Sequence, residues 1–303
     1  MFKNLMLFRI EPSWSKSTAQ IEAGLAQVRF RECSATQEKS VGWSEPRGEK
    51  HAMLVESIGG QLMLRLTTEA KVLPSSVVKR RTDERVEKIE ETTGRKLSRM
   101  EKKDLREETL LDLLPKAFTR ISNTTVWIDQ VARLLVIDAA GQTKADEVVA
   151  VLLRSLDGLV ITQVQTTGAP GSQMAAWLLS HDAPGRFDVD RECELKATDE
   201  SEGVVRYSKH TLNVEEVRKH IQSGKMVTKL ALTWNGRVSF VLNDVLQVKK
   251  LKFLEGALEN PDGADSAGKD EDRFDADVAI VTGELSKLIP DLIEALGGEL
   301  VIA

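Results

Sequence analysis

The chain has 303 residues, 41% of them hydrophobic and 29% charged, so it is long enough to bury more than one core. Its 42 basic and 47 acidic side chains give a net charge of -5, which argues against nucleic-acid binding over the whole surface. Cys33 and Cys193 lie far apart, which argues against a disulfide framework or a zinc site. No apolar run is long enough for a membrane helix, and charges interrupt the amino terminus, so we expect a cytoplasmic protein without a signal peptide.

The first half of the chain shows strand and helix patterns on both sides of a highly charged segment. In chain order, the predicted elements are a strand over 2–10, a helix over 17–30 with Ser17 or Thr18 as N-cap, a loop through Trp43, Pro46 and Gly48, a strand over 61–68, a helix start at 73–76, strands over 126–128 and 134–137, a helix over 145–156 and a strand over 159–164.

The second half has its own pattern, with Asn235-Gly236 as the strongest turn signal. The predicted elements are a short helix around Trp177, a strand over 204–207, a helix from Asn213 to Gly224 with Glu216 at the third helical position, strands over 226–234, 237–242 and 245–253, an acidic loop over 259–277, a strand over 278–282 and a helix over 284–296.

The charged segment concentrates the basic residues of the chain. Residues 71–120 contain 14 basic and 10 acidic side chains, which leaves a net charge of -9 on the remainder. Val78, Thr82 and Ile89 recur at helical spacing, and Ser98 with Glu101 forms a capping box that starts a second helix. The pattern predicts an antiparallel helical hairpin inserted into an α+β domain.

The cations of this hairpin fall on helix faces. Arg81, Arg85 and Lys88 share one face of the first helix. The second helix carries a row of four cations, Arg99, Lys102, Lys103 and Arg106. One interpretation is a solvated hairpin with weak ion pairs such as Glu84–Lys88 or Lys103–Glu107. The other is a phosphate-binding surface, which would be blind to sequence because aromatic residues are scarce. The candidate DNA-binding residues, including Arg120 and those of two further clusters, are Lys79, Arg81, Arg85, Lys88, Arg99, Lys102, Lys103, Arg106, Arg120, Arg206, Lys209, Lys249 and Lys250.

Catalytic motifs give little support for an enzyme. The chain lacks a P-loop, so no nucleotide cofactor is expected, and its histidines are scattered. The strongest catalytic alternative is a magnesium-dependent nuclease that would use Asp275, Asp277 and Glu284. An exposed or capping role is the ordinary interpretation of these carboxylates.

Short stretches along the whole chain add a separate indication. They are Met1-Phe-Lys-Asn-Leu-Met6, Lys71-Val-Leu-Pro74, Leu113-Leu-Pro-Lys-Ala-Phe-Thr-Arg120, Val126-Trp-Ile-Asp129, Gly224-Lys-Met-Val-Thr-Lys-Leu-Ala-Leu232, Arg273-Phe-Asp-Ala-Asp277 and Leu292-Ile-Glu-Ala-Leu-Gly-Gly298. In these stretches, and in their order, the chain resembles the bacterial recombination-associated RdgC family.

The resemblance implies a homodimer that closes into a ring, with a basic hole through which double-stranded DNA passes without sequence readout. It also implies antagonism of RecA-promoted recombination, support of replication and association with the nucleoid. Two contacts would close such a ring, one at Phe118 and the other around Lys209 and His210.

These observations lead to one set of expectations. The fold class is α+β, with mixed sheets, flanking helices and the projecting hairpin, in a horseshoe-shaped protomer that closes into a ring dimer. The expected parts are an α+β domain of residues 1–72 with 115–165, a hairpin of residues 73–114, and a second α+β domain of residues 166–303. A DNA-binding ring without enzymatic activity is the first functional hypothesis; a nuclease and a scaffold that docks acidic partners through the hairpin are the alternatives.

Overall fold

A computed structural model of the chain describes residues 2–49, 51–180, 182–200, 202–212, 215–255 and 270–300. The fold is α+β and contains two sheets, one of seven strands and one of five. We expected mixed sheets, and this was wrong: every pair of neighbouring strands that the structure describes is antiparallel. Short turns and hairpins connect many of the strands, and such connections favour antiparallel pairing.

The seven-stranded sheet is built around a long hairpin of β4 and β5, whose register runs from Gln61 opposite Asp129 to Val72 opposite Phe118. Its strand order is β2-β4-β5-β6-β1-β7, and β3 also pairs with β4. The strands are β1 (Met6–Ile10), β2 (Lys39–Ser44), β3 (Val55–Ile58), β4 (Gln61–Val72), β5 (Phe118–Asp129), β6 (Leu134–Ile137) and β7 (Ile161–Gln163).

Alternation of side chains gives this sheet two buried faces. One face carries Phe8, Leu64 and Val126 and is covered by α1 (Thr18–Ala26) and α4 (Gln142–Ser155). Ser17 caps α1 and accepts a hydrogen bond from the Gln20 backbone N–H, as predicted. The opposite face carries Leu7, Met63 and Trp127, which belong to a core shared with the second sheet.

The five-stranded sheet has the order β12-β11-β10-β8-β9. Helices pack on one of its faces, where Met174, Trp177 and Val217 meet Leu230 and Leu232 of the sheet. The elements are α5 (Pro170–Ser180), β8 (Phe187–Lys196), β9 (Val204–Ser208), α6 (Glu215–Gln222), β10 (Met226–Trp234), β11 (Val238–Asn243), β12 (Val248–Phe253) and α7 (Asp270–Ala295).

Backbone and side-chain contacts join the two sheets. Leu5 and Val248 exchange backbone hydrogen bonds of 2.8 and 3.1 Å. At the far end of the chain, Glu299 receives a bidentate contact from Arg9, with N–O distances of 2.7 and 2.8 Å. The amino-terminal strand and the carboxyl-terminal segment therefore hold the two sheets against each other.

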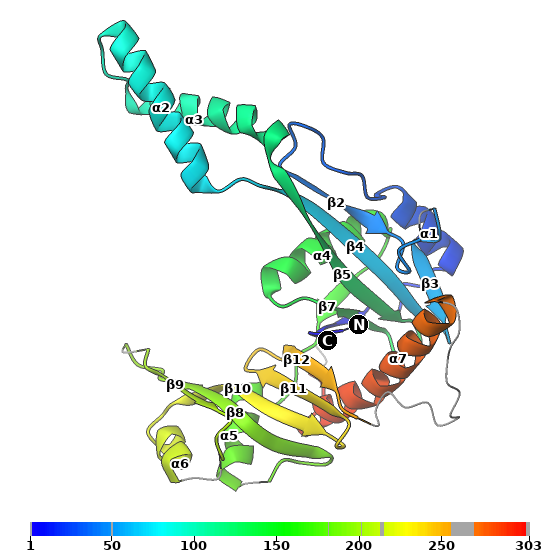
Figure 1. Ribbon diagram of the computed structural model, residues 1–303. Helices are drawn as coiled ribbons and strands as arrows, with labels where there is room; N and C mark the ends of the chain where they lie inside the picture. Colours follow the sequence, from blue (N-terminus) through cyan, green and yellow to red (C-terminus); the bar gives the residue numbers. More distant parts are fainter. Residues whose placement is uncertain are drawn as a thin grey trace.

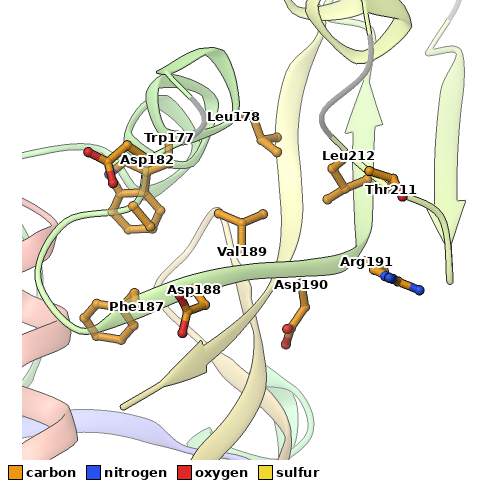
Figure 2. A pocket seen from close by; sticks show the side chains of 11 residues that line it. Trp177, Leu178, Asp182, Phe187, Asp188, Val189, Asp190, Arg191, Thr211 and Leu212 are labelled. Atoms are coloured by element: carbon orange, nitrogen blue, oxygen red, sulfur yellow. The ribbon is translucent and has the colours of Figure 1, made fainter. Parts of the chain in front are cut away.

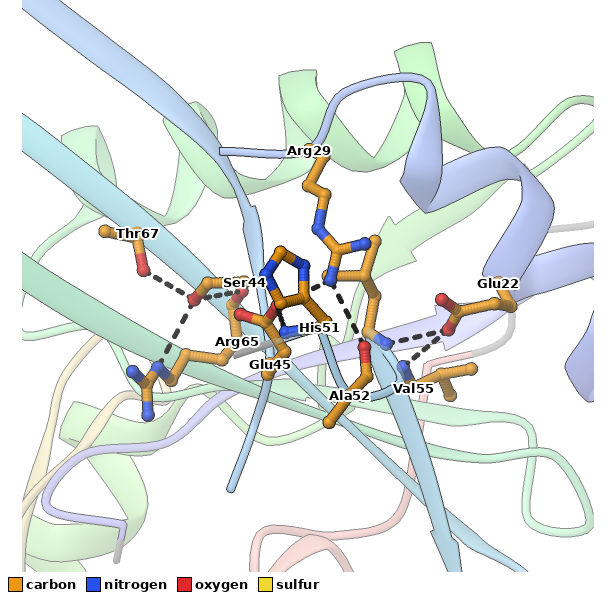
Figure 3. Close-up of polar contacts among 10 residues, drawn as sticks. Glu22, Arg29, Ser44, Glu45, His51, Ala52, Val55, Arg65 and Thr67 are labelled. Carbon is orange, nitrogen blue, oxygen red and sulfur yellow. Dashed lines mark hydrogen bonds and ion pairs between the residues drawn. The ribbon is translucent and has the colours of Figure 1, made fainter. Parts of the chain in front are cut away.

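A polar network on the edge of the seven-stranded sheet fixes the loop between β2 and β3 (Figure 3). Arg29 donates to a Glu45 carboxylate oxygen at 2.5 Å and to the Ala52 carbonyl at 3.2 Å. Glu22 of α1 accepts hydrogen bonds from the Leu54 and Val55 backbone N–H groups at 2.8 and 3.0 Å. The anchored loop carries Arg47, whose guanidinium contacts Glu56 of β3 and Asp275 of α7 at 3.1 and 2.6 Å and lies over the Phe274 ring.

The charged segment forms the predicted helical hairpin. Its helices are α2 (Ser75–Thr93) and α3 (Arg99–Leu113), followed by a short 3-10 turn, Leu114–Lys116. Figure 1 shows the hairpin projecting from the β4–β5 end of the large sheet, far from the five-stranded sheet. A narrow buried seam, made of Val78, Thr82, Leu105 and Thr109, holds the helices together.

Three differences from the sequence-based expectations concern secondary structure. Residues 270–277 were expected in a loop and residues 278–282 in a strand, but both lie inside α7, where Val278, Val281 and Leu285 are buried on one helix face. Trp43 was expected in a loop but is buried in β2, and its indole N–H donates to Ser155 of α4 at 2.8 Å. Strands β3 and β8 were not predicted. The expected cap at Asn213 and the 259–269 part of the acidic loop lie outside the described residues.

Candidate nucleic-acid interface

The basic row of α3 is fully displayed on the hairpin surface. Arg99, Lys102, Lys103 and Arg106 are all exposed. Lys102 approaches Glu90 of α2 at 3.3 Å and Lys103 approaches Glu107 at 3.8 Å. Within the described ranges, Arg99 and Arg106 have no carboxylate partner, so their guanidinium groups are available to an external anion.

The cations of α2 divide into two kinds. Arg85 turns toward α3 and donates to the Thr109 hydroxyl at 3.0 Å and to Asp112 at 2.9 Å. Arg81 is paired with Glu84 at 2.8 Å. Lys79 and Lys88 are exposed and form no ion pair with any residue that the structure describes. The predicted basic face of α2 therefore contains one arginine that ties the two helices together.

The tip of the hairpin is held in one shape by polar contacts. Gly94 adopts a left-handed conformation that ends α2, and Ser98 caps α3 with the predicted capping box. Arg95 contacts Glu101 at 2.6 Å, and this contact, together with hydrogen bonds from Ser98, lowers the pKa of Glu101 to about 2. These contacts therefore fix the two helices, and the cations on them, relative to each other.

A second group of cations lies on the outer face of the five-stranded sheet, the face opposite its helices. Glu194 lies between Arg206 and Lys229, with N–O distances of 2.6 and 2.9 Å. Burial alone would raise the pKa of Glu194, but hydrogen bonds from Arg206, Lys229 and Thr228 outweigh it and lower the pKa to about 2. Lys250 is paired with Glu192, whereas Lys249 has no carboxylate partner among the described residues.

Sequence reasoning missed two members of this outer face, Lys196 and Lys229. Lys229 stands directly opposite Glu194 in the ladder, and Lys196 is paired with Glu202. The signal was the alternation of charged and apolar residues in β8, from Glu192 to Lys196. Lys196 was overlooked because β8 itself was not predicted, and Lys229, although it lies in the predicted strand 226–234, was overlooked because its partner Glu194 lies in β8.

The residues expected at dimer contacts are exposed at two separate places. Phe118 is 87% exposed at the base of the hairpin, and Val72, its cross-strand partner, is 48% exposed. Arg120 is exposed two residues further along β5. Lys209 and His210 are exposed just after β9, where the His210 ring lies 5.8 Å from the Tyr207 ring.

The structure does not bring all candidate cations together in one chain. The hairpin group lies at one end of the molecule, and the group on the five-stranded sheet lies at the other, with α4 between them (Figure 1). A single continuous basic surface would therefore need more than one chain. Otherwise, a ligand that contacts both groups must be long enough to reach from one end of the molecule to the other.

The three carboxylates of the nuclease alternative do not converge. Asp275 and Asp277 are two residues apart on α7 and so point roughly 200° apart around the helix, while Glu284 follows about 10 Å further along the axis. Asp275 is bound to Arg47, and Glu284 to Arg237 at 2.9 Å. In the described part of the chain, no group of three or more acidic, histidine or cysteine side chains is arranged to hold a metal ion.

Comparison with known proteins places these features in a family. The model of the family described as "Putative exonuclease, RdgC" matches residues 1–299. The chain belongs to the RdgC family. Proteins named "Recombination-associated protein RdgC" from Cupriavidus necator and Bordetella pertussis are 44% and 41% identical over 298 residues, which cover 98% of each chain. The one from Dechloromonas aromatica is 43% identical over 305 residues, which cover 100% of this chain and 99% of the relative.

The RdgC names support a role in recombination and point to two kinds of activity. The family description names an exonuclease, whereas the relatives are named for recombination. No helix in the described ranges is long and apolar enough to cross a membrane.

Proposed function

We propose that the protein binds double-stranded DNA without sequence preference, as a ring-shaped homodimer that encircles the duplex. Through this binding it restrains RecA-promoted recombination, supports replication and associates with the nucleoid. The observation that carries the proposal is the exposed pair Arg99 and Arg106, which have no carboxylate partner among the described residues, in a chain of a recombination-associated family. Cations of this kind bind phosphates, which every DNA sequence presents alike.

The dimer part of the proposal rests on exposed apolar surface. Phe118 is 87% exposed and Val72, directly opposite it in the ladder, is 48% exposed, so the two form an apolar pair that a protein contact would bury. In the proposed ring, Phe118 of each protomer forms one contact and the Lys209–His210 region forms the other. The protomer would then be the horseshoe of the family resemblance, and two protomers would bring both groups of cations around one hole.

A net-negative protein can act in this way because a ring holds DNA by enclosing it. The outside of the ring can stay acidic while the cations face the duplex. Modest phosphate contacts then suffice, since dissociation requires the ring to open or to reach a DNA end.

The phosphate contacts can be tested by the salt dependence of DNA binding. Replacing both Arg99 and Arg106 by Ala should reduce the slope of log K against log salt by about 0.9 for each lost phosphate contact, equally for duplexes of different sequence. The matched control is Arg31→Ala with Lys219→Ala, which removes the same charge from two exposed sites outside the hairpin. An unchanged slope in the Arg99 and Arg106 variant would show that these cations do not reach phosphate.

The same protein can be tested for the activity in the family description. Incubation with Mg2+ should give no degradation of a linear duplex from its ends and no nicking of a supercoiled plasmid if the protein only binds DNA. Nicking that disappears in Asp277→Ala would establish the nuclease alternative instead. The scaffold alternative predicts that the protein does not retard DNA even at low salt.

A further inference from the structure

A groove runs beside an uncovered length of β8 in the five-stranded sheet. The groove has a volume of about 380 Å3 and lies among β8, the end of α5 and the segment that follows β9 (Figure 2). Strand β9 pairs only with residues 192–196 of β8, so on that side the beginning of β8 has no neighbouring strand among the described residues.

The register of β8 shows which backbone groups face the groove. Asn235 donates its backbone N–H to the Arg186 carbonyl at 2.7 Å, and Asp188 stands opposite Thr233 in the same register. In an antiparallel pair, alternate residues bond toward the same neighbour, so the N–H and C=O of Val189 point away from β10. The Arg191 carbonyl points the same way and accepts the His210 N–H at 3.2 Å. Among the described residues, this is the last backbone contact to this edge of β8.

The side chains around this edge combine an apolar floor with acidic groups. Trp177, Leu178 and Leu212 are buried in the floor, with Val189 half-buried beside them. Asp182 and Asp188 are exposed at the rim, and neither is paired with a cation among the described residues. Arg191 is the one basic side chain among the described residues that line the groove.

We propose that this groove binds a short, extended segment of another protein, which adds a strand to β8 and carries basic residues between apolar ones. The backbone of the segment would bond to the uncovered edge at Val189. Side chains alternate along a strand, so the apolar residues of the segment would face the floor on the side of Val189, and its lysines or arginines would lie on the other side with Asp188 (Figure 2). A basic residue at the end of the segment would reach Asp182, which lies beside Trp177. Charge complementarity thus selects a basic partner for this acidic rim. The proposal does not depend on DNA binding.

The test uses the full chain and a dye-labelled seven-residue peptide of alternating lysine and valine, followed by fluorescence anisotropy. We expect this peptide to bind about tenfold more tightly than an alternating glutamate–valine peptide. It should also bind about tenfold more tightly than the same lysine–valine peptide with backbone N-methyl groups, which block strand addition. Each tenfold difference in affinity corresponds to about 1.4 kcal/mol. Hydrogen exchange at the Val189 amide should slow when the peptide binds.

A matched pair of variants separates the groove from general charge. Asp182→Asn with Asp188→Asn should weaken the lysine–valine peptide about tenfold, whereas Asp104→Asn with Asp157→Asn, which removes the same charge from exposed sites elsewhere, should leave it unchanged. Equal binding of the N-methylated peptide, or equal loss in both variants, would overturn the proposal. The proposal would also be overturned if the peptide did not bind and the groove variant differed from the unmodified chain in oligomer mass, because the groove would then bind a second copy of the chain.

Discussion

At the scale of single residues, partners decide which cations can serve as DNA contacts. Arg85 and Lys88 are both basic residues of α2, yet Arg85 bonds to Thr109 and Asp112 of the neighbouring helix while Lys88 is exposed without a carboxylate partner among the described residues. A phosphate that recruits Arg85 must break contacts that join the helices. A phosphate that recruits Lys88 or Arg99 breaks none of the contacts described.

This difference predicts that two alanine substitutions affect different properties, one the stability of the hairpin and the other DNA binding. Arg85→Ala should lower the free energy of unfolding of the hairpin by about 0.5–1.5 kcal/mol, because it removes hydrogen bonds between the helices at a partly exposed site. Lys88→Ala should leave that stability unchanged and weaken DNA binding. Hydrogen exchange of the α2 and α3 amides measures the first effect and DNA titration the second. Equal exchange rates in the two variants would contradict the assignment of Arg85.

Glu194 gives a residue-scale prediction about pH. Its pKa in the folded protein is about 2, below the ordinary value of about 4.3 in an unfolded chain. A lowered pKa means that its contribution to stability is present above the unfolded value and is lost as the pH falls from about 4.3 toward 2. Urea unfolding at neutral pH and at pH values within that window should show a smaller loss of stability in Glu194→Gln than in the unmodified chain. An identical loss in both proteins would mean that Glu194 titrates normally.

Side-chain partners of this kind mark the limit of what the sequence predicts. The spacing of residues 98–106 predicted the capping box and the basic row of α3 correctly, because both are properties of one helix. The inward turn of Arg85 and the clamp of Glu194 between Arg206 and Lys229 depend on neighbouring elements. Their register is set by tertiary packing, which a single sequence does not specify.

At the scale of elements, the hairpin is attached at one point of the large sheet. Val72 and Phe118 are directly opposite in the β4–β5 ladder, so the chain leaves and re-enters the sheet at neighbouring positions. The buried seam of the hairpin is separate from the two main cores. We propose that residues 73–114 fold as a unit of their own, whereas the core on one side of the large sheet is shared with the second sheet.

Replacement of residues 73–117 by Asn-Gly tests this element. A two-residue turn fits between directly opposed strand residues, so β4 and β5 should keep their register and the body should keep its urea midpoint. DNA affinity should fall, and its salt dependence should become shallower because the α2 and α3 cations are gone. A body that fails to fold, as judged by circular dichroism and cooperative unfolding, would show that the hairpin is part of the core.

Helix α7 shows why one element was predicted wrongly. Residues 278–282 are Val-Ala-Ile-Val-Thr, a β-branched run that favours a strand locally. In the structure, Val278, Val281 and Leu285 face the core together, and Arg47 holds the start of the helix through Asp275. Tertiary packing therefore overrides the local preference. By contrast, the hairpin around Asn235-Gly236 formed as predicted because the turn itself specifies the register.

At the scale of the whole molecule, one chain carries basic groups at both ends and an exposed aromatic contact at the hairpin base. Neither group alone surrounds a duplex. The proposed ring of two chains brings them around one hole while the net charge of -5 per chain is distributed mainly outside. Enclosure is thus the central claim, because it explains how an acidic protein could hold DNA.

Release from circular and linear DNA tests enclosure most directly. The protein is loaded at low salt on a closed circular plasmid or on the same plasmid cut once, and both are then moved to salt that screens phosphate contacts. We expect the protein to stay on the circular plasmid and to slide off the linear one. It should be retained on linear DNA when a bulky protein blocks both ends. The Phe118→Asp variant should lose retention on the circular plasmid. Equal release from circular and linear DNA would contradict the ring.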